Sequence, residues 1–142
     1  MVRKFDHITF VVRDVEAAKR FFTVLGFKET QSVVISGKVM EDYMGIKDLE
    51  ADNVTLAIEN PHAEVQLLHY RHPEVIVDPN ITQLNKLGFN HVCFSVDDIE
   101  AEVAKLTTAG VKLRNQIMDF HNRKLVFVDG PEDITVELAQ WH

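Results

Sequence analysis

Apolar and polar residues alternate along two stretches of the chain, residues 5–12 (FDHITFVV) and 89–96 (FNHVCFSV). An alternation of period two is typical of β-strands that bury one face. After each stretch the apolar residues recur at helical spacing instead: Val15, Ala18, Phe22 and Leu25 in the first copy, and Ile99, Val103 and Leu106 in the second. Each copy therefore predicts a strand followed by a helix.

Residues typical of helix ends flank both predicted helices. Asp14 and Asp98 precede them, and a short carboxylate accepts the unpaired amide protons of a first helical turn. Gly26 and Gly110 follow, where a helix end favours a left-handed residue. Further β-like runs come after each glycine: VVIS, VTLAIE and EVQLLHY in the first half, and KLVFV and ITVELAQW in the second. Each half is therefore predicted as βαβββ.

The two halves are copies of one another. Residues 5–28 align with residues 89–112 at a constant offset of 84 without a gap, and ten of the 24 aligned positions are identical. After one gap the closing strands also align, which pairs Gln66 with Glu137. An internal repeat of this kind defines the fold. We predict one domain, residues 1–142, made of modules 5–70 and 88–141 joined by a linker, residues 71–87.

Residues 37–52 have no counterpart in the second half, and we expect an irregular excursion there, of a kind that often carries specificity.

Polar residues occupy equivalent places on the strand faces that look away from the helices. They are His7 and Gln66 in the first half and His91 and Glu137 in the second. A single polar residue on an alternating strand usually marks a half-exposed face. Two imidazoles, an amide and a carboxylate at matching positions of a repeat form a set that borderline divalent metals accept. The absence of thiolates suits a catalytic site.

Composition and charge narrow the class of protein. The net charge is −7, and no dense block of Lys and Arg offsets it, so we expect no nucleic-acid or membrane partner. No long apolar run predicts a signal peptide or a membrane span. The single cysteine, Cys93, suits a reducing cytoplasm. Its strand offers no helix N-terminus that would activate the thiol, so we expect no nucleophilic role.

The repeat, together with this polar set, resembles the vicinal oxygen chelate superfamily, which includes glyoxalase I, methylmalonyl-CoA epimerase, extradiol dioxygenases and bleomycin-resistance proteins. The likeness runs from DHITFVVRDVEAAKRFFTVLGF to VFVDGPEDITVELAQW. It implies an α+β fold in which paired βαβββ modules form a U-shaped, half-open barrel around one cavity. It also implies one divalent metal ion (Zn, Ni, Co, Mn or Fe) held by His7, Gln66, His91 and Glu137, and a homodimer. The set resembles that of some methylmalonyl-CoA epimerases, whereas glyoxalase I generally has glutamate in the second position.

Three functions follow from the resemblance. The first is a glyoxalase-like lyase, isomerase or epimerase that acts on a small carbonyl substrate through a metal-stabilised enediolate, with Glu137 as the base. The second is an Fe(II) dioxygenase that uses the triad His7, His91 and Glu137. The third is a non-catalytic binding or resistance protein, which need not keep the ligand residues. We favour the first. The usual DPDG before the last strand is DGPED here.

Four further residues are candidates for contact with the substrate: Tyr43, Tyr70, His121 and Arg123. Tyr70 shares the strand face of Gln66, and His121 and Arg123 lie in or beside a predicted turn. A two-base epimerase needs a second acid, for which Glu41 and Glu50 of the excursion are candidates.

Overall fold

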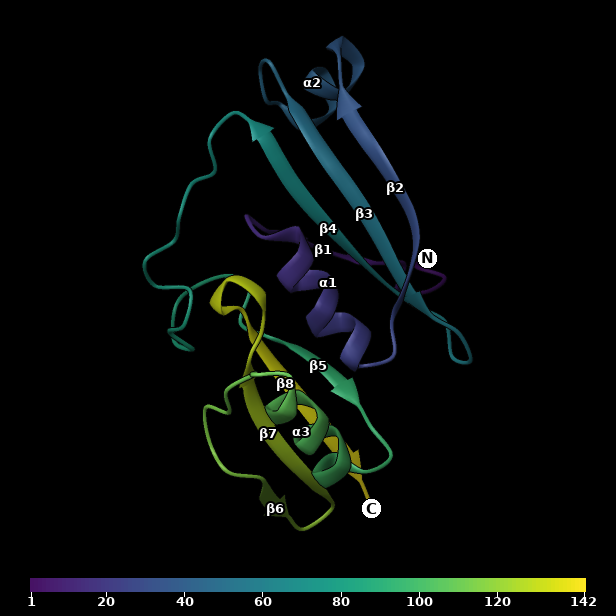
Figure 1. Ribbon diagram of the computed structural model, residues 1–142, viewed down its shortest axis with the longest axis vertical. Helices are drawn as coiled ribbons and strands as arrows, with labels where there is room; N and C mark the ends of the chain where they lie inside the picture. The colour runs from purple at the N-terminus through teal and green to yellow at the C-terminus, as the bar shows by residue number, and fades with distance from the viewer. The chain divides into compact units, whose positions relative to one another are not determined.

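The chain folds into two βαβββ units, as the alternation predicts. The computed structural model describes residues 1–142, which divide into Met1–Val77 and Asp78–His142 (Figure 1). The first unit contains β1 (Ile8–Val11), α1 (Val15–Val24), β2 (Lys28–Ser36), α2 (Lys38–Met44), β3 (Glu50–Ile58) and β4 (Ala63–His72). The second contains β5 (Val92–Ser95), α3 (Ile99–Thr108), β6 (Met118–Phe120), β7 (Arg123–Asp129), the 3-10 turn η1 (Pro131–Asp133) and β8 (Thr135–Trp141). The α+β fold of paired βαβββ modules is therefore confirmed.

The two sheets have the same strand order, which is β1-β4-β3-β2 in the first unit and β5-β8-β7-β6 in the second. In each, the first strand pairs in parallel with the last. The registers also agree, because Thr9 lies opposite Gln66 and its equivalent, Cys93, lies opposite Glu137. The repeat in the sequence is thus a repeat of backbone geometry down to single residues.

The ends of the main helices confirm the predicted caps. The Asp14 carboxylate accepts a hydrogen bond from the Ala17 amide, and the Asp98 carboxylate accepts one from the Ala101 amide, both at 2.9 Å. Gly26 and Gly110 follow these helices with φ values of +95° and +89°, a region that residues with a Cβ rarely adopt. Both ends of each helix are therefore set locally by the sequence.

One face of each sheet is covered by its helix. In the first unit, Phe10 packs against Phe22 of α1 with ring centroids 5.8 Å apart, and Val65 and Leu67 are buried on the same side. In the second unit, Val136 and Leu138 are buried on the side of α3, whose Ile99 and Leu106 are fully covered. The strand face that carries Gln66 or Glu137 points away from that helix.

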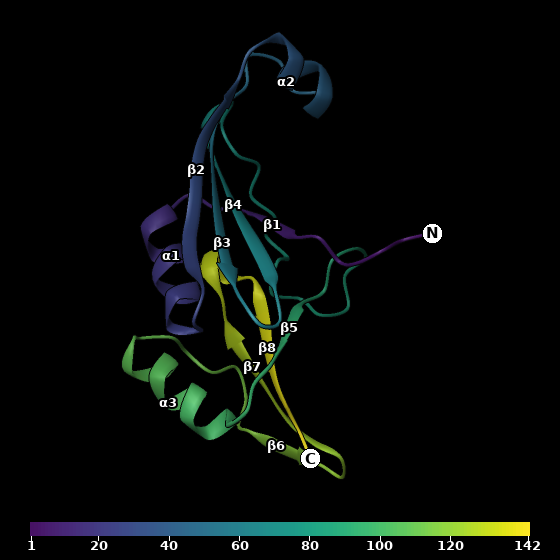
Figure 2. The ribbon, with the colours of Figure 1, turned by 90° about the vertical axis from the view of Figure 1, so that its right-hand side faces the viewer.

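The excursion, residues 37–52, is more ordered than the sequence suggested. Lys38–Met44 form α2, and β3 begins at Glu50. Figure 2 shows α1 on one side of the sheet and α2 at its end, on the other side. There the partly buried Met40 and Met44 pack against a cluster of Leu49, Ala51 and Leu68. The excursion is therefore held by an apolar contact with the sheet face that carries Gln66.

The other boundaries differ slightly from the prediction. The first strands are shorter than 5–12 and 89–96, so His7 and His91 stand just before β1 and β5. β4 continues to His72, which shortens the expected linker.

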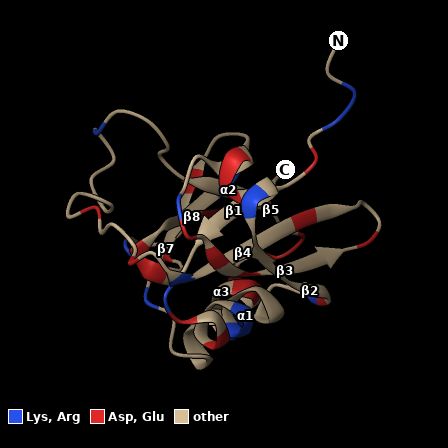
Figure 3. Cartoon of the chain, turned by 90° about the horizontal axis from the view of Figure 1, so that it is seen from above, with Lys and Arg blue, Asp and Glu red and all other residues tan.

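None of the helices has both the length and the apolar composition that a membrane crossing requires. Asp and Glu are spread over helices and strands of both units, consistent with the negative net charge (Figure 3).

Candidate metal site

His91 and Glu137 lie together in the second unit. The Nε2 atom of His91 is 3.8 Å from an Oε atom of Glu137, and the two side chains are about one-third and one-seventh exposed. Phe127 of β7 packs edge-on against the His91 ring, with centroids 5.3 Å apart. On the other side of the ring, Nδ1 is 2.7 Å from Oδ1 of Asn90. We call His91 and Glu137 the second half-site.

The hydrogen bonds around His91 determine which of its nitrogens carries the proton. The Nδ2 group of Asn90 donates to the carbonyl of Leu84, so Oδ1 of Asn90 is the atom that faces His91. Because that oxygen only accepts, Nδ1 of His91 is the donor, and Nε2 of the neutral ring keeps its lone pair. A lone pair therefore faces a carboxylate oxygen across 3.8 Å, a distance beyond hydrogen-bond range.

That arrangement fits a divalent cation. Nitrogen and oxygen ligands lie roughly 2.0–2.2 Å from a bound zinc ion, so two ligands of one ion are separated by at most about 4.4 Å. The 3.8 Å separation of Nε2 and Oε2 lies within that limit. Both atoms are electron-pair donors with no proton to share, and a cation between them satisfies both.

The position of Glu137 on β8 depends on Arg114. Nε of Arg114 donates to the Asp129 carboxylate at 2.6 Å, and one NH2 group donates to the carbonyl of Asp133 at 2.7 Å. The other NH2 group donates to the buried hydroxyl of Thr135, the first residue of β8. Arg114 thus holds both sides of the DGPED turn. The sequence showed it only as an isolated basic residue.

Cys93 is the neighbour of Glu137 across the β5–β8 pair. Partial burial, and then the hydrogen bond with the Glu137 carboxylate, raise the pKa of the Cys93 thiol to about 12. The protonated thiol donates to that carboxylate, and its high pKa argues against a nucleophilic role, in agreement with the sequence.

His7 and Gln66 belong to the first unit, and we call them the first half-site. Nδ1 of His7 is 2.6 Å from the Asp6 carboxylate. This bond is the main cause that lowers the pKa of Asp6. Gln66 accepts a hydrogen bond from Nδ2 of Asn53 at 3.2 Å, while the buried Oδ1 of Asn53 has no hydrogen-bond partner. An amide oxygen has two lone pairs, so this face retains unused acceptor capacity suited to a cation.

A second carboxylate also approaches His7. Asp6, His7 and Glu64 form a group that could hold a metal ion, with their ligand atoms all within 4.8 Å of one another. Glu64 precedes Gln66 by two residues on β4 and therefore shares its strand face. Glu64 and Asp6 are not among the site residues predicted from the sequence. The strand periodicity identifies Glu64 as a neighbour of Gln66, and the DH and NH dipeptides of the repeat identify Asp6 and Asn90.

The four residues predicted to contact the substrate lie on different elements of the fold and differ in their surroundings. Tyr43 on α2 is exposed, and Tyr70 packs partly buried against the Leu49, Ala51 and Leu68 cluster. His121 lies exposed in the turn between β6 and β7. The guanidinium of Arg123 stacks over the Trp141 ring at 4.8 Å, and both residues are in register with each other across β7 and β8. Arg123 lies four residues before Phe127 on β7, and Trp141 lies four residues after Glu137 on β8. Residues an even number apart on a strand share a face, so Arg123 and Trp141 lie on the face of Glu137.

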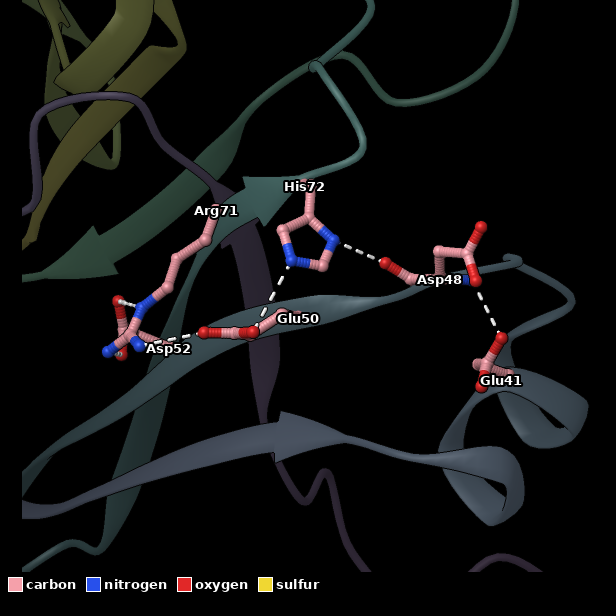
Figure 4. Close-up of polar contacts among 6 residues, drawn as sticks. All are labelled: Glu41, Asp48, Glu50, Asp52, Arg71 and His72. Atoms are coloured by element: carbon pink, nitrogen blue, oxygen red, sulfur yellow. Dashed lines mark hydrogen bonds and ion pairs between the residues drawn. The ribbon is translucent and has the colours of Figure 1, made fainter.

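A polar network fastens the end of the excursion to β4 (Figure 4). Arg71 donates to Asp52 at 2.7 Å and to Glu50 at 2.9 Å. The neighbouring His72 donates to the carbonyl of Asp48 from Nδ1, and its Nε2 lies 3.3 Å from Glu50. The loop between α2 and β3 is thus tied to the last residues of β4.

Glu41 also serves this network. Its carboxylate accepts a hydrogen bond from the Asp48 amide at 2.7 Å, as Figure 4 shows. Glu41 and Glu50, which the sequence suggested as second acids, are therefore both engaged in holding the excursion.

Paired βαβββ units with histidines before each first strand define the class of protein to which this chain belongs. The sequence matches the family model of the Glyoxalase/Bleomycin resistance protein/Dioxygenase superfamily over residues 4–138, and the chain belongs to that superfamily.

Curated relatives and solved structures agree with this assignment. Glyoxalase I of Saccharomyces cerevisiae is 31% identical over 83 residues, a match that covers 56% of this chain and 26% of the yeast protein. Lactoylglutathione lyase of Schizosaccharomyces pombe is 35% identical over 54 residues, which is 38% of this chain and 18% of that protein. The matches thus span about a quarter or less of the length of these relatives.

Among solved structures, a glyoxalase family protein from Bacillus cereus superposes with a TM-score of 0.91 at 23% identity, covering 99% of this chain and 95% of that one. The fosfomycin resistance protein FosX from Listeria monocytogenes, complexed with Mn(II) and sulfate, has a TM-score of 0.65 at 12% identity. That match covers 100% of this chain and 95% of FosX. These similarities establish the fold.

Proposed function

We propose that this protein is a divalent-metal-dependent lyase, isomerase or epimerase that removes a proton next to a carbonyl group of a small substrate. The observation that carries the proposal is the second half-site, where the lone pair of His91 Nε2 faces the Glu137 carboxylate at 3.8 Å. The names of the curated relatives, Glyoxalase I and Lactoylglutathione lyase, support the lyase class.

Four residues, His7, Gln66, His91 and Glu137, are proposed as the ligands of one ion. A divalent cation held by two neutral imidazoles, one neutral amide and one carboxylate has a net charge of +1. Such an ion would act as a Lewis acid toward the substrate carbonyl and lower the cost of negative charge on its oxygen. The FosX structure with Mn(II) is consistent with a metal in this fold.

Glu137 is proposed as the base. It is the only carboxylate among the four, and its side chain is only about one-seventh exposed. A single base on one side of the substrate predicts selectivity for one enantiomer. Glu41 and Glu50 are engaged around α2, so a second base for an epimerase would come from another residue.

Solvent exchange tests the reaction. We would incubate lactoylglutathione, and a panel of α-hydroxy and α-acyl carbonyl compounds, with the metal-loaded protein in D₂O. Deuterium should appear at the carbon next to the carbonyl. Glu137→Gln should stop the exchange, whereas Glu59→Gln, which alters an exposed carboxylate of the first unit, should not. Oxygen consumption on catechols with iron, and no deuterium in any carbonyl compound, would instead identify a dioxygenase.

Metal titration tests the ligands separately from the reaction. His91→Ala and Glu137→Ala should abolish tight binding of the metal, while Gln66→Ala should weaken it less, because a neutral amide oxygen is the poorest of the four ligands. Equal affinity of His91→Ala and the parent protein in calorimetry would refute the assignment. Failure of the parent protein to bind any of Zn, Ni, Co, Mn or Fe would favour a binding protein.

We further propose a homodimer, on the strength of the family alone. Sedimentation velocity of the metal-loaded protein should give the mass of two chains, and a single-chain mass at high concentration would refute this.

A further inference from the structure

The two candidate histidines are held in the same way. Nδ1 of His7 is 2.6 Å from the side-chain oxygen of Asp6, and Nδ1 of His91 is 2.7 Å from that of Asn90. Asp6 and Asn90 occupy equivalent positions of the repeat, each directly before its histidine. The same contact therefore occurs twice, with a carboxylate in one unit and an amide in the other.

We propose that Asp6 and Asn90 are positioning residues that fix the tautomer and the ring orientation of the two histidines, so that each presents the lone pair of Nε2 to a metal ion. This inference rests on the proposed metal site, but it concerns residues outside the proposed ligand set. A histidine that binds a metal through one nitrogen needs an acceptor for the proton of the other.

Each acceptor is unambiguous. The ionised carboxylate of Asp6 has no proton to donate, so Nδ1 of His7 must be the donor. The Asn90 amide could in principle face His91 with either end, but its Nδ2 group is bound to the carbonyl of Leu84. That bond turns Oδ1 toward His91. Hydrogen bonds thus link the Leu84 carbonyl to the Asn90 side chain, and the Asn90 side chain to Nδ1 of His91. The other nitrogen of His91, Nε2, is left facing Glu137.

Asp6 could instead be a ligand itself. Asp6, His7 and Glu64 have ligand atoms within 4.8 Å of one another, and two carboxylates with one imidazole also suit a divalent ion. The hydrogen bond between Asp6 and His7 favours the positioning role, because an oxygen that accepts from Nδ1 at 2.6 Å holds the ring with Nε2 directed elsewhere. Asp6→Asn distinguishes the two roles, because an amide oxygen still accepts a hydrogen bond from His7 but is a poorer metal ligand than a carboxylate.

The experiment has two measurements. Long-range proton–nitrogen correlation spectra of the metal-free protein, at a pH where the histidines are neutral, report the tautomer of each ring directly. His7 and His91 should both be protonated on Nδ1 in the parent protein. Asp6→Ala should shift His7, and Asn90→Ala should shift His91, toward the Nε2-protonated form that free imidazole side chains favour. Asp6→Asn and Asn90→Asp, which keep an acceptor, should preserve the Nδ1-protonated form.

The second measurement is zinc affinity by calorimetry. Asp6→Ala and Asn90→Ala should each weaken zinc binding about 10- to 100-fold, the range seen when such supporting partners are removed. Asp6→Asn should lose clearly less than Asp6→Ala, because it restores the acceptor. Glu59→Ala removes the carboxylate beside another exposed histidine, His62, and serves as the matched control. It should alter neither the spectra of His7 and His91 nor the affinity.

The outcomes separate this inference from the proposed function. Unchanged tautomers in Asp6→Ala and Asn90→Ala would overturn the inference. So would equal losses of affinity in Asp6→Asn, Asp6→Ala and Glu64→Gln, which would make Asp6 a ligand. If the parent protein binds no zinc or other divalent ion, the proposed metal site fails and this inference fails with it, even if the tautomers are as expected.

Discussion

At the scale of single residues, neighbouring groups decide which atoms of a side chain can act. His91 has two nitrogens, and the Asn90 oxygen occupies one of them, which leaves the other facing Glu137. Glu137 in turn accepts from Cys93, whose pKa is raised first by partial burial and then by this hydrogen bond. For a polar residue in an alternating strand, the sequence predicts only which face of the sheet the side chain lies on. Its protonation and its free lone pairs come from these contacts.

The thiol of Cys93 is predicted to react slowly with alkylating reagents. A raised pKa keeps the thiol protonated, so the reactive thiolate is scarce until the pH approaches 12. At pH 9, on the order of a thousandth of the folded, metal-free protein should carry the thiolate, against about half for an unperturbed cysteine. Iodoacetamide labelling followed by mass spectrometry should therefore be hundreds of times slower in folded than in urea-unfolded protein.

Glu137→Gln should accelerate this labelling, because the change removes a negative charge that disfavours the thiolate. Glu100→Gln, which lies on α3 and pairs with Lys124, is the control and should leave the rate unchanged. Labelling of the folded parent protein as fast as that of the unfolded chain would contradict the raised pKa.

At the scale of elements, short polar contacts place the strands that carry the site. β8 begins at Thr135, one residue beyond the DGPED turn, in which Glu132 and Asp133 both have positive φ values, of 55° and 62°. Residues other than glycine are strained in that region, so surrounding contacts must hold them there. Arg114 supplies those contacts through Asp129, Asp133 and Thr135.

Arg114→Ala is predicted to lower the free energy of unfolding by about 2 kcal/mol, since hydrogen bonds to charged groups contribute about 1.5–3 kcal/mol each and this site is partly exposed. It should also weaken metal binding, because the turn no longer fixes the start of β8. Urea unfolding and metal titration measure the two effects. Arg3→Ala, in the exposed N-terminal segment, is the control. An unchanged unfolding midpoint in Arg114→Ala would show that the turn holds itself.

The α2 segment is predicted to loosen when its polar fastening is removed. Arg71 and His72 connect the end of β4 to Asp48, Glu50 and Asp52, whereas the helix itself has only a small apolar contact with the sheet. Arg71→Ala should therefore increase amide hydrogen exchange in residues 38–48 more than in β5–β8. Lys47→Ala, in the same loop, is the comparison. Equal exchange in Arg71→Ala and the parent protein would mean that the apolar contact suffices.

At the scale of the whole molecule, the proposed metal ion would stabilise the folded chain. A ligand that binds only the folded state raises the free energy of unfolding by about 2.7 kcal/mol at a concentration one hundred times its dissociation constant. For a chain of 142 residues we therefore expect metal to raise Tm by roughly 5–10 °C and EDTA to reverse the shift.

Variants of each half-site are compared with the parent protein in this measurement of the metal-induced Tm shift. His7→Ala, in the first unit, and His91→Ala, in the second, should each abolish the metal-induced shift while changing the Tm of the metal-free protein little. A shift that survives either substitution would contradict the proposed ligand set.

The amino-acid sequence was enough to predict the two βαβββ units, the caps of their main helices and the faces of their strands. Those features depend on contacts between near neighbours, such as Asp14 with Ala17, and on periodicities that the chain displays directly. The repeat also identified Gln66 and Glu137 as equivalent positions of the two units, because copies of one unit share one strand register.

Tertiary structure alone decided the environment of each candidate. The Arg114 contacts around the turn could not be predicted, since they join residues whose spacing follows no period. The α2 helix has only seven residues and lies in a segment predicted to be irregular, and the approach of Glu64 to His7 depends on the parallel pairing of β1 with β4. The pairing of Leu84 with Asn90 is of the same kind, and it settles which nitrogen of His91 is free. Chemistry at a site depends on such contacts because a lone pair becomes available only where no neighbouring donor occupies it.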